Sequence, residues 1–128
     1  MTLILDSGGV SALTGNRARL AELRNRDLWP PQVPAVVLAE ALTGDARRDF
    51  HANHLLRTCQ VRDIDEPMSR EAARLRTATG RASKISAVDA VVAAFASLHP
   101  DPIVLTSDPR DLGVLAAQTV RPITVAAT

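Results

Sequence analysis

Short segments that suit β-strands alternate with stretches of helical periodicity along this chain. The strand-like segments lie at residues 2–5, 33–36, 60–64, 103–105 and 123–125. Short strands that alternate with helices are typical of a parallel sheet that helices cover on both faces. We therefore predict an α/β fold with a central, mainly parallel sheet.

The helices are predicted from apolar residues that recur every three or four positions. They are expected at residues 10–23, from 37 to about 44, and at 45–57, 67–80, 87–99 and 112–118. Pro30, Pro31 and Pro34 limit the strand at 33–36, which must be short or lie on an edge. Ser86 is the expected N-cap of the helix that follows it.

Length and composition narrow the class of protein. The 128 residues suit a single domain, 1–128. No apolar run reaches the roughly 20 residues of a membrane span, and the N-terminus lacks the features of a signal peptide, so we expect a cytoplasmic protein with no membrane partner. Only Trp29, Phe50 and Phe95 are aromatic, which argues against base stacking as the way this chain would hold nucleic acid.

Two aspartates follow predicted strands. Asp6 comes directly after the first strand, and Asp108 lies just past the strand at 103–105. Because ligands of open α/β sheets bind outside the carboxyl ends of the strands, both acids should lie on the same rim of the sheet. The alternative is that each aspartate only caps the helix that follows it.

Two further acids lie within apolar helical segments. Asp89 has Ile85, Val92 and Ala93 as its neighbours one helical turn away, and no cation lies one turn from it. Burying a lone carboxylate costs several kcal/mol or raises its pKa, so Asp89 needs a partner unless it lies on an exposed strip. Glu40 poses the same problem in the segment 36–42.

Four carboxylates in one site would repel one another unless a positive charge lies between them. A divalent metal supplies that charge, and ligation by oxygen alone favours Mg²⁺ or Mn²⁺ over Zn²⁺. His51 and His54 lie three residues apart on a predicted helix, but nothing in the sequence completes a zinc site with them.

The order of these motifs resembles a PIN domain, and within that superfamily it is most similar to the VapC toxins of bacterial VapBC toxin–antitoxin systems. The motifs are Ile4-Leu5-Asp6-Ser7, Leu38-Ala39-Glu40, the run from Asp89 to Ala94, and Leu105-Thr106-Ser107-Asp108. Each motif is weak alone. Four of them in this order, spread over nearly the whole chain, are fairly specific.

The resemblance implies a three-layer α/β/α sandwich and a Mg²⁺- or Mn²⁺-dependent ribonuclease that hydrolyses RNA phosphodiester bonds. It also implies the toxin role in a type II toxin–antitoxin system, a homodimer, and a VapB-type antitoxin as partner. The site residues that it implies are Asp6, Glu40, Asp89 and Asp108 as catalytic and metal-binding acids, Asp111 as an accessory metal-binding acid, and Thr106 as a substrate-orienting hydroxyl. The chain departs from the family at Gly8, where a polar Ser or Asn is usual, and a hydrogen bond that supports the metal ligands is then missing.

Two other functions are alternatives to the ribonuclease. A phosphatase that uses Asp6 as its nucleophile, like the haloacid dehalogenases, needs a second Asp two residues later, where this chain has Gly8. A non-catalytic PIN-like module that binds RNA or protein would be consistent with Gly8 but not with the intact acidic set.

Several arginines allow two interpretations. Arg70, Arg74 and Arg81 fall near one face of a predicted helix, and Lys84 follows. They would either track a phosphate backbone or form a solvated helix face.

Overall fold

Five parallel strands form the central sheet. The computed structural model describes all residues, 1–128. The strands are β1 (Thr2–Leu5), β2 (Gln32–Pro34), β3 (Gln60–Arg62), β4 (Pro102–Thr106) and β5 (Thr124–Ala127), in the order β3-β2-β1-β4-β5. All four pairings are parallel, which confirms the predicted sheet.

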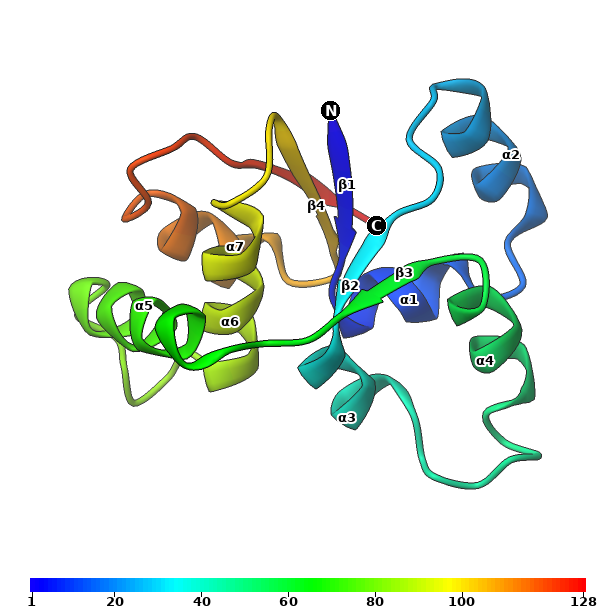
Figure 1. Ribbon diagram of the computed structural model, residues 1–128, viewed down its shortest axis with the longest axis horizontal. Helices are drawn as coiled ribbons and strands as arrows, with labels where there is room; N and C mark the ends of the chain where they lie inside the picture. The colour runs from blue at the N-terminus through cyan, green and yellow to red at the C-terminus, as the bar shows by residue number, and fades with distance from the viewer.

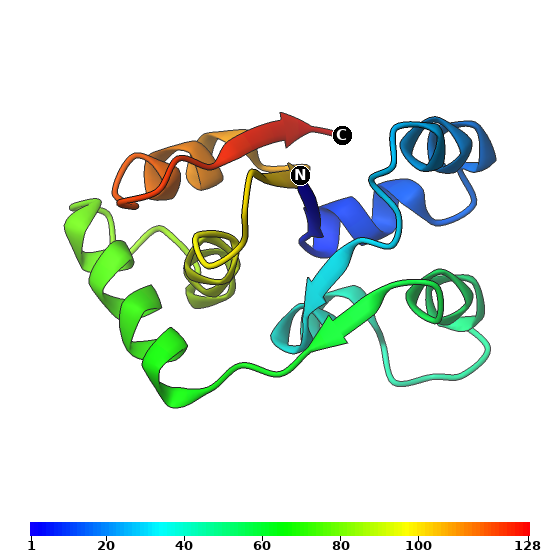
Figure 2. The same ribbon diagram turned by 45° about the horizontal axis from the view of Figure 1, so that its top comes forward.

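Helices cover both faces of this sheet (Figures 1 and 2). On one side lie α1 (Ser7–Leu13), α2 (Arg17–Asn25) and α4 (Phe50–Leu56), and on the other lie α5 (Glu66–Ala78), α6 (Ala87–Ala96) and α7 (Pro109–Ala116). A 3₁₀ turn, η1 (Ala35–Val37), and the single-turn α3 (Leu38–Ala41) continue from the carboxyl end of β2. The predicted three-layer α/β/α sandwich is confirmed.

The core is almost entirely aliphatic, as the scarcity of aromatic residues requires. Ile4 and Leu5 of β1 and Val104 of β4 are each at most 2% exposed, because both faces of these central strands are covered. Helix α6 contributes Val92 and Phe95 to the same core. The short strand β2 ends at Pro34 and pairs on both sides, so it is short without being an edge strand.

Three predicted helices are wrong in their extent, and the one expected from 37 to about 44 is only the four-residue α3. The helix expected over residues 10–23 divides into α1 and α2, because Gly15 takes a φ of +77° and the Asn16 side chain then caps α2 by accepting from the N–H of Arg19 at 3.1 Å. The helix expected from Asp45 begins only at Phe50. The Asp45 carboxylate closes a separate turn instead, by accepting from the N–H of Arg47 at 2.9 Å.

The topology creates a switch point between β1 and β4. The chain leaves β1 toward α1 on one face, and it leaves β4 toward α7 on the opposite face (Figure 1). Such a divergence opens a crevice at the carboxyl ends of the two strands. Leu5 pairs with Leu105, so Asp6 and Thr106 follow at the same level of the sheet. No helix combines the length and apolarity that spanning a membrane requires.

Candidate active site

Asp6 lies at the carboxyl end of β1 and is 4% exposed. It is the N-cap of α1, where its Oδ1 accepts from the N–H of Gly9 at 2.8 Å. Asp6 therefore does cap the helix that follows it, but capping accounts for only one of the two carboxylate oxygens. The second oxygen accepts no hydrogen bond from the protein.

Asp108 has the equivalent position after β4. It is the N-cap of α7, with its Oδ1 accepting from the N–H of Asp111 at 3.3 Å. The N–H of Asp108 in turn donates to Oγ1 of Thr106 at 2.9 Å, and Thr106 is fully buried. The Thr106 hydroxyl therefore acts on the backbone of Asp108 and holds the loop that carries this acid.

Asp89 lies half-buried in the first turn of α6, behind the predicted N-cap Ser86. The pKa of Asp89 is raised to about 6, mainly by burial and also by the negative charges of Asp6, Asp108 and Glu40, while the Ser86 hydroxyl opposes the rise. No Lys, Arg or His forms an ion pair with Asp89. The carboxylate is crowded by like charges and lacks a protein counter-charge.

Three carboxylates approach one another most closely and form what we call the acidic cluster. Oxygen atoms of Asp89, Asp108 and Asp111 all lie within 4.8 Å of one another. The pKa of Asp111 is raised by loss of hydration and by the neighbouring Asp108, while Arg110 and Arg81 lower it. Asp111, expected only as an accessory acid, thus belongs to the tightest group, and Asp6 lies close enough to raise the pKa of Asp89.

Of the two alternatives that the sequence left open for Glu40, burial with a partner or exposure, the structure shows exposure. Glu40 is exposed on α3, because this helix is a single turn at the end of β2 and does not pack an acidic residue into the core. The Ser7 hydroxyl donates to its Oε1 at 3.3 Å and ties Glu40 to the start of α1. Sequence reasoning gave Ser7 no role, although its position directly after Asp6 was the available signal.

The N-termini of three helices meet at this rim of the sheet. Asp6 caps α1, Asp89 lies in the first turn of α6, and Asp108 and Asp111 occupy the cap and first turn of α7. The partial positive charge of a helix N-terminus stabilises a nearby carboxylate by about 0.3–1 kcal/mol. This helps the fold tolerate the crowded acids.

Gly8 lies against the loop after β4. A Cβ atom on Gly8 would meet the Ser107 hydroxyl and would lie 2.6 Å from the Ser107 Cβ and 2.8 Å from its backbone N. Ser107 therefore already fills the space that a side chain at position 8 would need. Nothing in the sequence indicated this approach.

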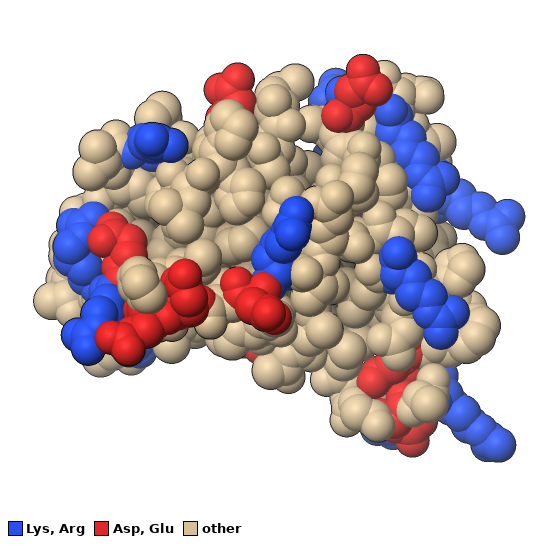
Figure 3. Space-filling view, in the orientation of Figure 1, with Lys and Arg blue, Asp and Glu red and all other residues tan.

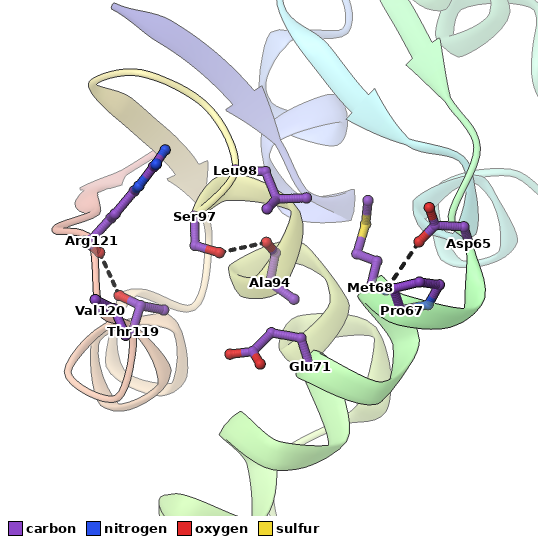
Figure 4. A pocket seen from close by; sticks show the side chains of 10 residues that line it. All are labelled: Asp65, Pro67, Met68, Glu71, Ala94, Ser97, Leu98, Thr119, Val120 and Arg121. Carbon is purple, nitrogen blue, oxygen red and sulfur yellow. Dashed lines mark hydrogen bonds between the residues drawn. The ribbon is translucent and has the colours of Figure 1, made fainter.

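A polar hollow flanks the site. It has a volume of about 470 Å³ and is lined by Ser7, Gly8, Glu40 and Ser107 among others. A larger, more apolar hollow of about 480 Å³ lies elsewhere, between α5, α6 and the chain after α7 (Figure 4). There the hydroxyls of Ser97 and Thr119 are bonded to the carbonyls of Ala94 and Arg121, and no predicted site acid is present.

The donor atoms of the cluster fit a hard divalent cation. All are carboxylate oxygens, none is neutralised by an ion pair, and no histidine or cysteine belongs to the group. Mg²⁺ and Mn²⁺ prefer such oxygen ligands. Burial raises the pKa values of Asp89 and Asp111 most, repulsion among the acids raises them as well, and a bound cation would relieve this repulsion.

Comparisons with known proteins identify the class to which this fold and site belong. A sequence model of the PIN domain matches residues 6–116, and the chain belongs to the PIN domain family. PIN domains form a family of nucleases, and a carboxylate site suits phosphodiester hydrolysis. No curated protein sequence matches the chain.

Solved structures with the same fold include proteins from toxin–antitoxin complexes. The DNA-bound VapBC complex from Salmonella typhimurium contains a chain with 15% identity and a TM-score of 0.68, the match covering 99% of this chain and 98% of that one. FitAcB from Neisseria gonorrhoeae has 21% identity and a TM-score of 0.66, and the match covers 97% of this chain and 96% of that one. PAE2754 from Pyrobaculum aerophilum has 17% sequence identity and a TM-score of 0.65, and the match covers 97% of this chain and 83% of that one. At these identities the likeness shows the fold.

Proposed function

We propose that this protein is a metal-dependent ribonuclease, the VapC-type toxin of a type II toxin–antitoxin system, acting in the cytoplasm as a single domain. The observation that carries the proposal is the acidic cluster, whose carboxylate oxygens lie within 4.8 Å of one another and form no ion pair with a cation of the protein. A PIN fold and a crevice at the carboxyl ends of β1 and β4 support it.

Asp6, Asp89 and Asp108 are the proposed ligands of Mg²⁺ or Mn²⁺, with Asp111 as a further oxygen donor. A bound cation would supply positive charge to neutralise the phosphodiester and to acidify the attacking water. Hydrogen bonds in the protein already fix two of these ligands, since Asp6 is held by Gly9 and Asp108 by Asp111 and Thr106. Thr106 is therefore a positioning residue in this proposal.

The proposed reaction is hydrolysis of an RNA phosphodiester. The water oxygen bonds to phosphorus and the water gives up a proton, while the bond from phosphorus to O3′ breaks and the leaving oxygen takes up a proton. The products are a 5′-phosphate and a 3′-hydroxyl. Glu40, held at one oxygen by Ser7, is proposed to orient the water or to add a ligand from the exposed side of the crevice.

Metal removal tests this function. Purified protein should bind Mn²⁺ in a calorimetric titration and should cleave structured RNA with Mg²⁺ or Mn²⁺, and EDTA should abolish cleavage. Asp63→Asn is a matched control, because Asp63 is exposed and its side chain forms no hydrogen bond or ion pair. Undiminished cleavage in EDTA would refute the metal mechanism.

An antitoxin partner and a homodimer complete the proposal. Similar folds occur in structures described as VapBC and FitAB complexes. We expect a small VapB-type protein to block the crevice, with one of its arginines entering the acidic cluster in place of the metal charge. Co-expression with the gene directly upstream should yield a complex that copurifies and restores growth. Failure of both would reject the toxin–antitoxin role and leave the nuclease proposal standing.

A further inference from the structure

A second hollow adjoins the acidic cluster and differs from it in charge. It has a volume of about 420 Å³ and is lined by Arg81 and Lys84 from the loop between α5 and α6, and by Arg110 and Asp111 from the first turn of α7. Asp111 belongs to both the hollow and the cluster. Three cations from two separate elements therefore converge directly beside the carboxylates.

None of these three cations forms an ion pair in the protein, although Arg81 and Arg110 lie close enough to Asp111 to lower its pKa. No carboxylate lies within 4.0 Å of the charged nitrogens of Arg81, Lys84 or Arg110. Arg70 and Arg74 on α5 differ, since Arg70 pairs with Glu66 at 2.8 Å and Arg74 with Glu71 at 2.6 Å. In Figure 3, acidic and basic side chains accordingly lie side by side over α5.

The two interpretations of these cations therefore apply to different residues. Arg70 and Arg74 form a solvated helix face whose charges are satisfied by neighbouring glutamates. Arg81 and Lys84 lie beyond the end of that helix and face a hollow. Their charge is left available for a ligand.

The backbone around the hollow is well fixed. The N–H groups of Lys84 and Ile85 donate to the carbonyl of Arg81 at 2.8 and 3.0 Å, which closes a tight turn. Ile85 is 1% exposed, and its carbonyl accepts from Nε of Arg76 at 2.6 Å, which ties this loop to α5. The positions of Arg81 and Lys84 are thus set by the fold, while their charged groups remain exposed.

We propose that Arg81, Lys84 and Arg110 form a subsite for a backbone phosphate of the nucleic acid, next to the phosphodiester that the carboxylates process. Arginine guanidinium groups bind phosphate oxygens bidentately, and lysine adds a point charge. No aromatic residue lines the hollow, so the subsite recognises the backbone and not a base. The inference rests on the proposed ribonuclease function, for which it names a contact that fixes the register of the strand.

RNA binding tests the subsite directly. The probe is a short, fluorescein-labelled, single-stranded RNA in Ca²⁺ buffer, with its Kd measured over a range of salt concentrations. Arg81→Gln, Lys84→Gln and Arg110→Gln should each weaken binding about three- to tenfold and reduce the slope of log K against log salt by about 0.7. Arg110→Lys should recover part of the loss, because it restores the charge without the bidentate geometry.

Arg70→Gln and Arg74→Gln are the matched controls, since each removes one positive charge from the adjoining helix. They should bind within about twofold of wild type. Equal losses in the controls, or wild-type affinity in the three subsite variants, would overturn the subsite. A single-stranded DNA of the same sequence should show the same relative losses, and a loss confined to RNA would also overturn it, because phosphate is common to both.

Cleavage distinguishes failure of the subsite from failure of the nuclease. If subsite variants lose RNA affinity but the wild type cleaves nothing, the subsite stands and the nuclease proposal falls. If the wild type cleaves with Mn²⁺ and the variants keep its KM and Kd, the subsite falls and the nuclease stands.

Discussion

Buried acids occur in two regions of this molecule, with opposite electrostatic consequences. Asp49, 5% exposed before α4, accepts hydrogen bonds from the N–H of Thr43 at 2.9 Å, from the Thr43 hydroxyl at 2.9 Å and from the N–H of Gly44 at 2.8 Å. These donors, the Thr43 N–H foremost, hold the pKa of Asp49 below its ordinary value. At the crevice, burial and neighbouring acids instead raise the pKa of Asp89 to about 6.

The difference lies in where the compensating groups come from. The loop at residues 43–49 supplies its own donors, helped by Gly44, whose φ of +85° turns its N–H toward the acid. Asp89 has one nearby hydroxyl, that of Ser86, and four acidic neighbours, which are Asp6, Glu40, Asp108 and Asp111. A carboxylate that the chain satisfies locally supports the fold, whereas a crowded one is stabilised only by a ligand from outside.

The largest expected effect is the loss of RNA cleavage when an acid of the crevice is substituted. Asp89→Asn and Asp108→Asn should each reduce RNA cleavage with Mn²⁺ by about 10³-fold or more, because a metal ligand is lost. Apo Asp89→Asn should melt at or above the wild-type temperature in EDTA, since one repulsive charge is removed. A variant that melts normally and cleaves at the wild-type rate would remove Asp89 from the site.

Asp49→Ala should show the reverse pattern. It leaves the N–H groups of Thr43 and Gly44 without their acceptor, so the melting temperature should fall by roughly 5–10 °C. Cleavage per folded molecule, measured well below the melting temperature, should stay within about twofold of wild type. Loss of cleavage in a folded Asp49→Ala protein would show that the two regions are coupled.

Much of this arrangement was predictable from sequence, because it depends on local pattern. Aliphatic segments identified the strands, and acids placed just after two of them could be assigned to one rim of a parallel sheet. Asp89 was anomalous within an apolar helix, and its environment proves to be crowded and half-buried. Ser86 was correctly predicted as its cap.

The remainder depends on contacts between distant segments. The approach of Gly8 to Ser107 joins residues from two loops that only the sheet brings together. The exposure of Glu40 follows from α3 being one turn long, which helical spacing alone could not predict. Arg70 and Arg74 form ion pairs, whereas Arg81 and Lys84 form none. This difference depends on side-chain partners, which helical periodicity does not specify.

Steric crowding at the crevice offers a third test. Gly8→Ser should destabilise the protein by about 1–3 kcal/mol, because its Cβ would meet Ser107. Adding Ser107→Gly should recover part of this loss by removing Ser107's side chain, although the contact with its backbone N remains. Urea unfolding in EDTA of the two single variants and the double variant gives the coupling energy. Strict additivity would show that the two positions do not compete for space.

The smallest effect is a pH dependence of stability in the metal-free protein. Because the folded pKa of Asp89 is raised to about 6, the folded state holds a proton more tightly than the unfolded chain, and ionising Asp89 disfavours folding. Stability should therefore fall as pH rises from about 4 to about 6, by on the order of 1 kcal/mol once solvent screening of a half-buried group is allowed for. Asp49, whose pKa is lowered, stabilises the fold in its ionised form, and this stabilisation is lost as pH falls below the pKa of Asp49 in the unfolded chain.

Urea unfolding in EDTA at pH values from about 4 to about 6 should show the decline in stability in wild type and in Asp63→Asn. The decline should be smaller in Asp89→Asn. Saturating Mn²⁺ should reverse the slope, because the cation binds the ionised carboxylates. If stability falls with pH as steeply in Asp89→Asn as in wild type, another group causes the decline. Asp89 would then not be the acid whose raised pKa contrasts with the lowered pKa of Asp49.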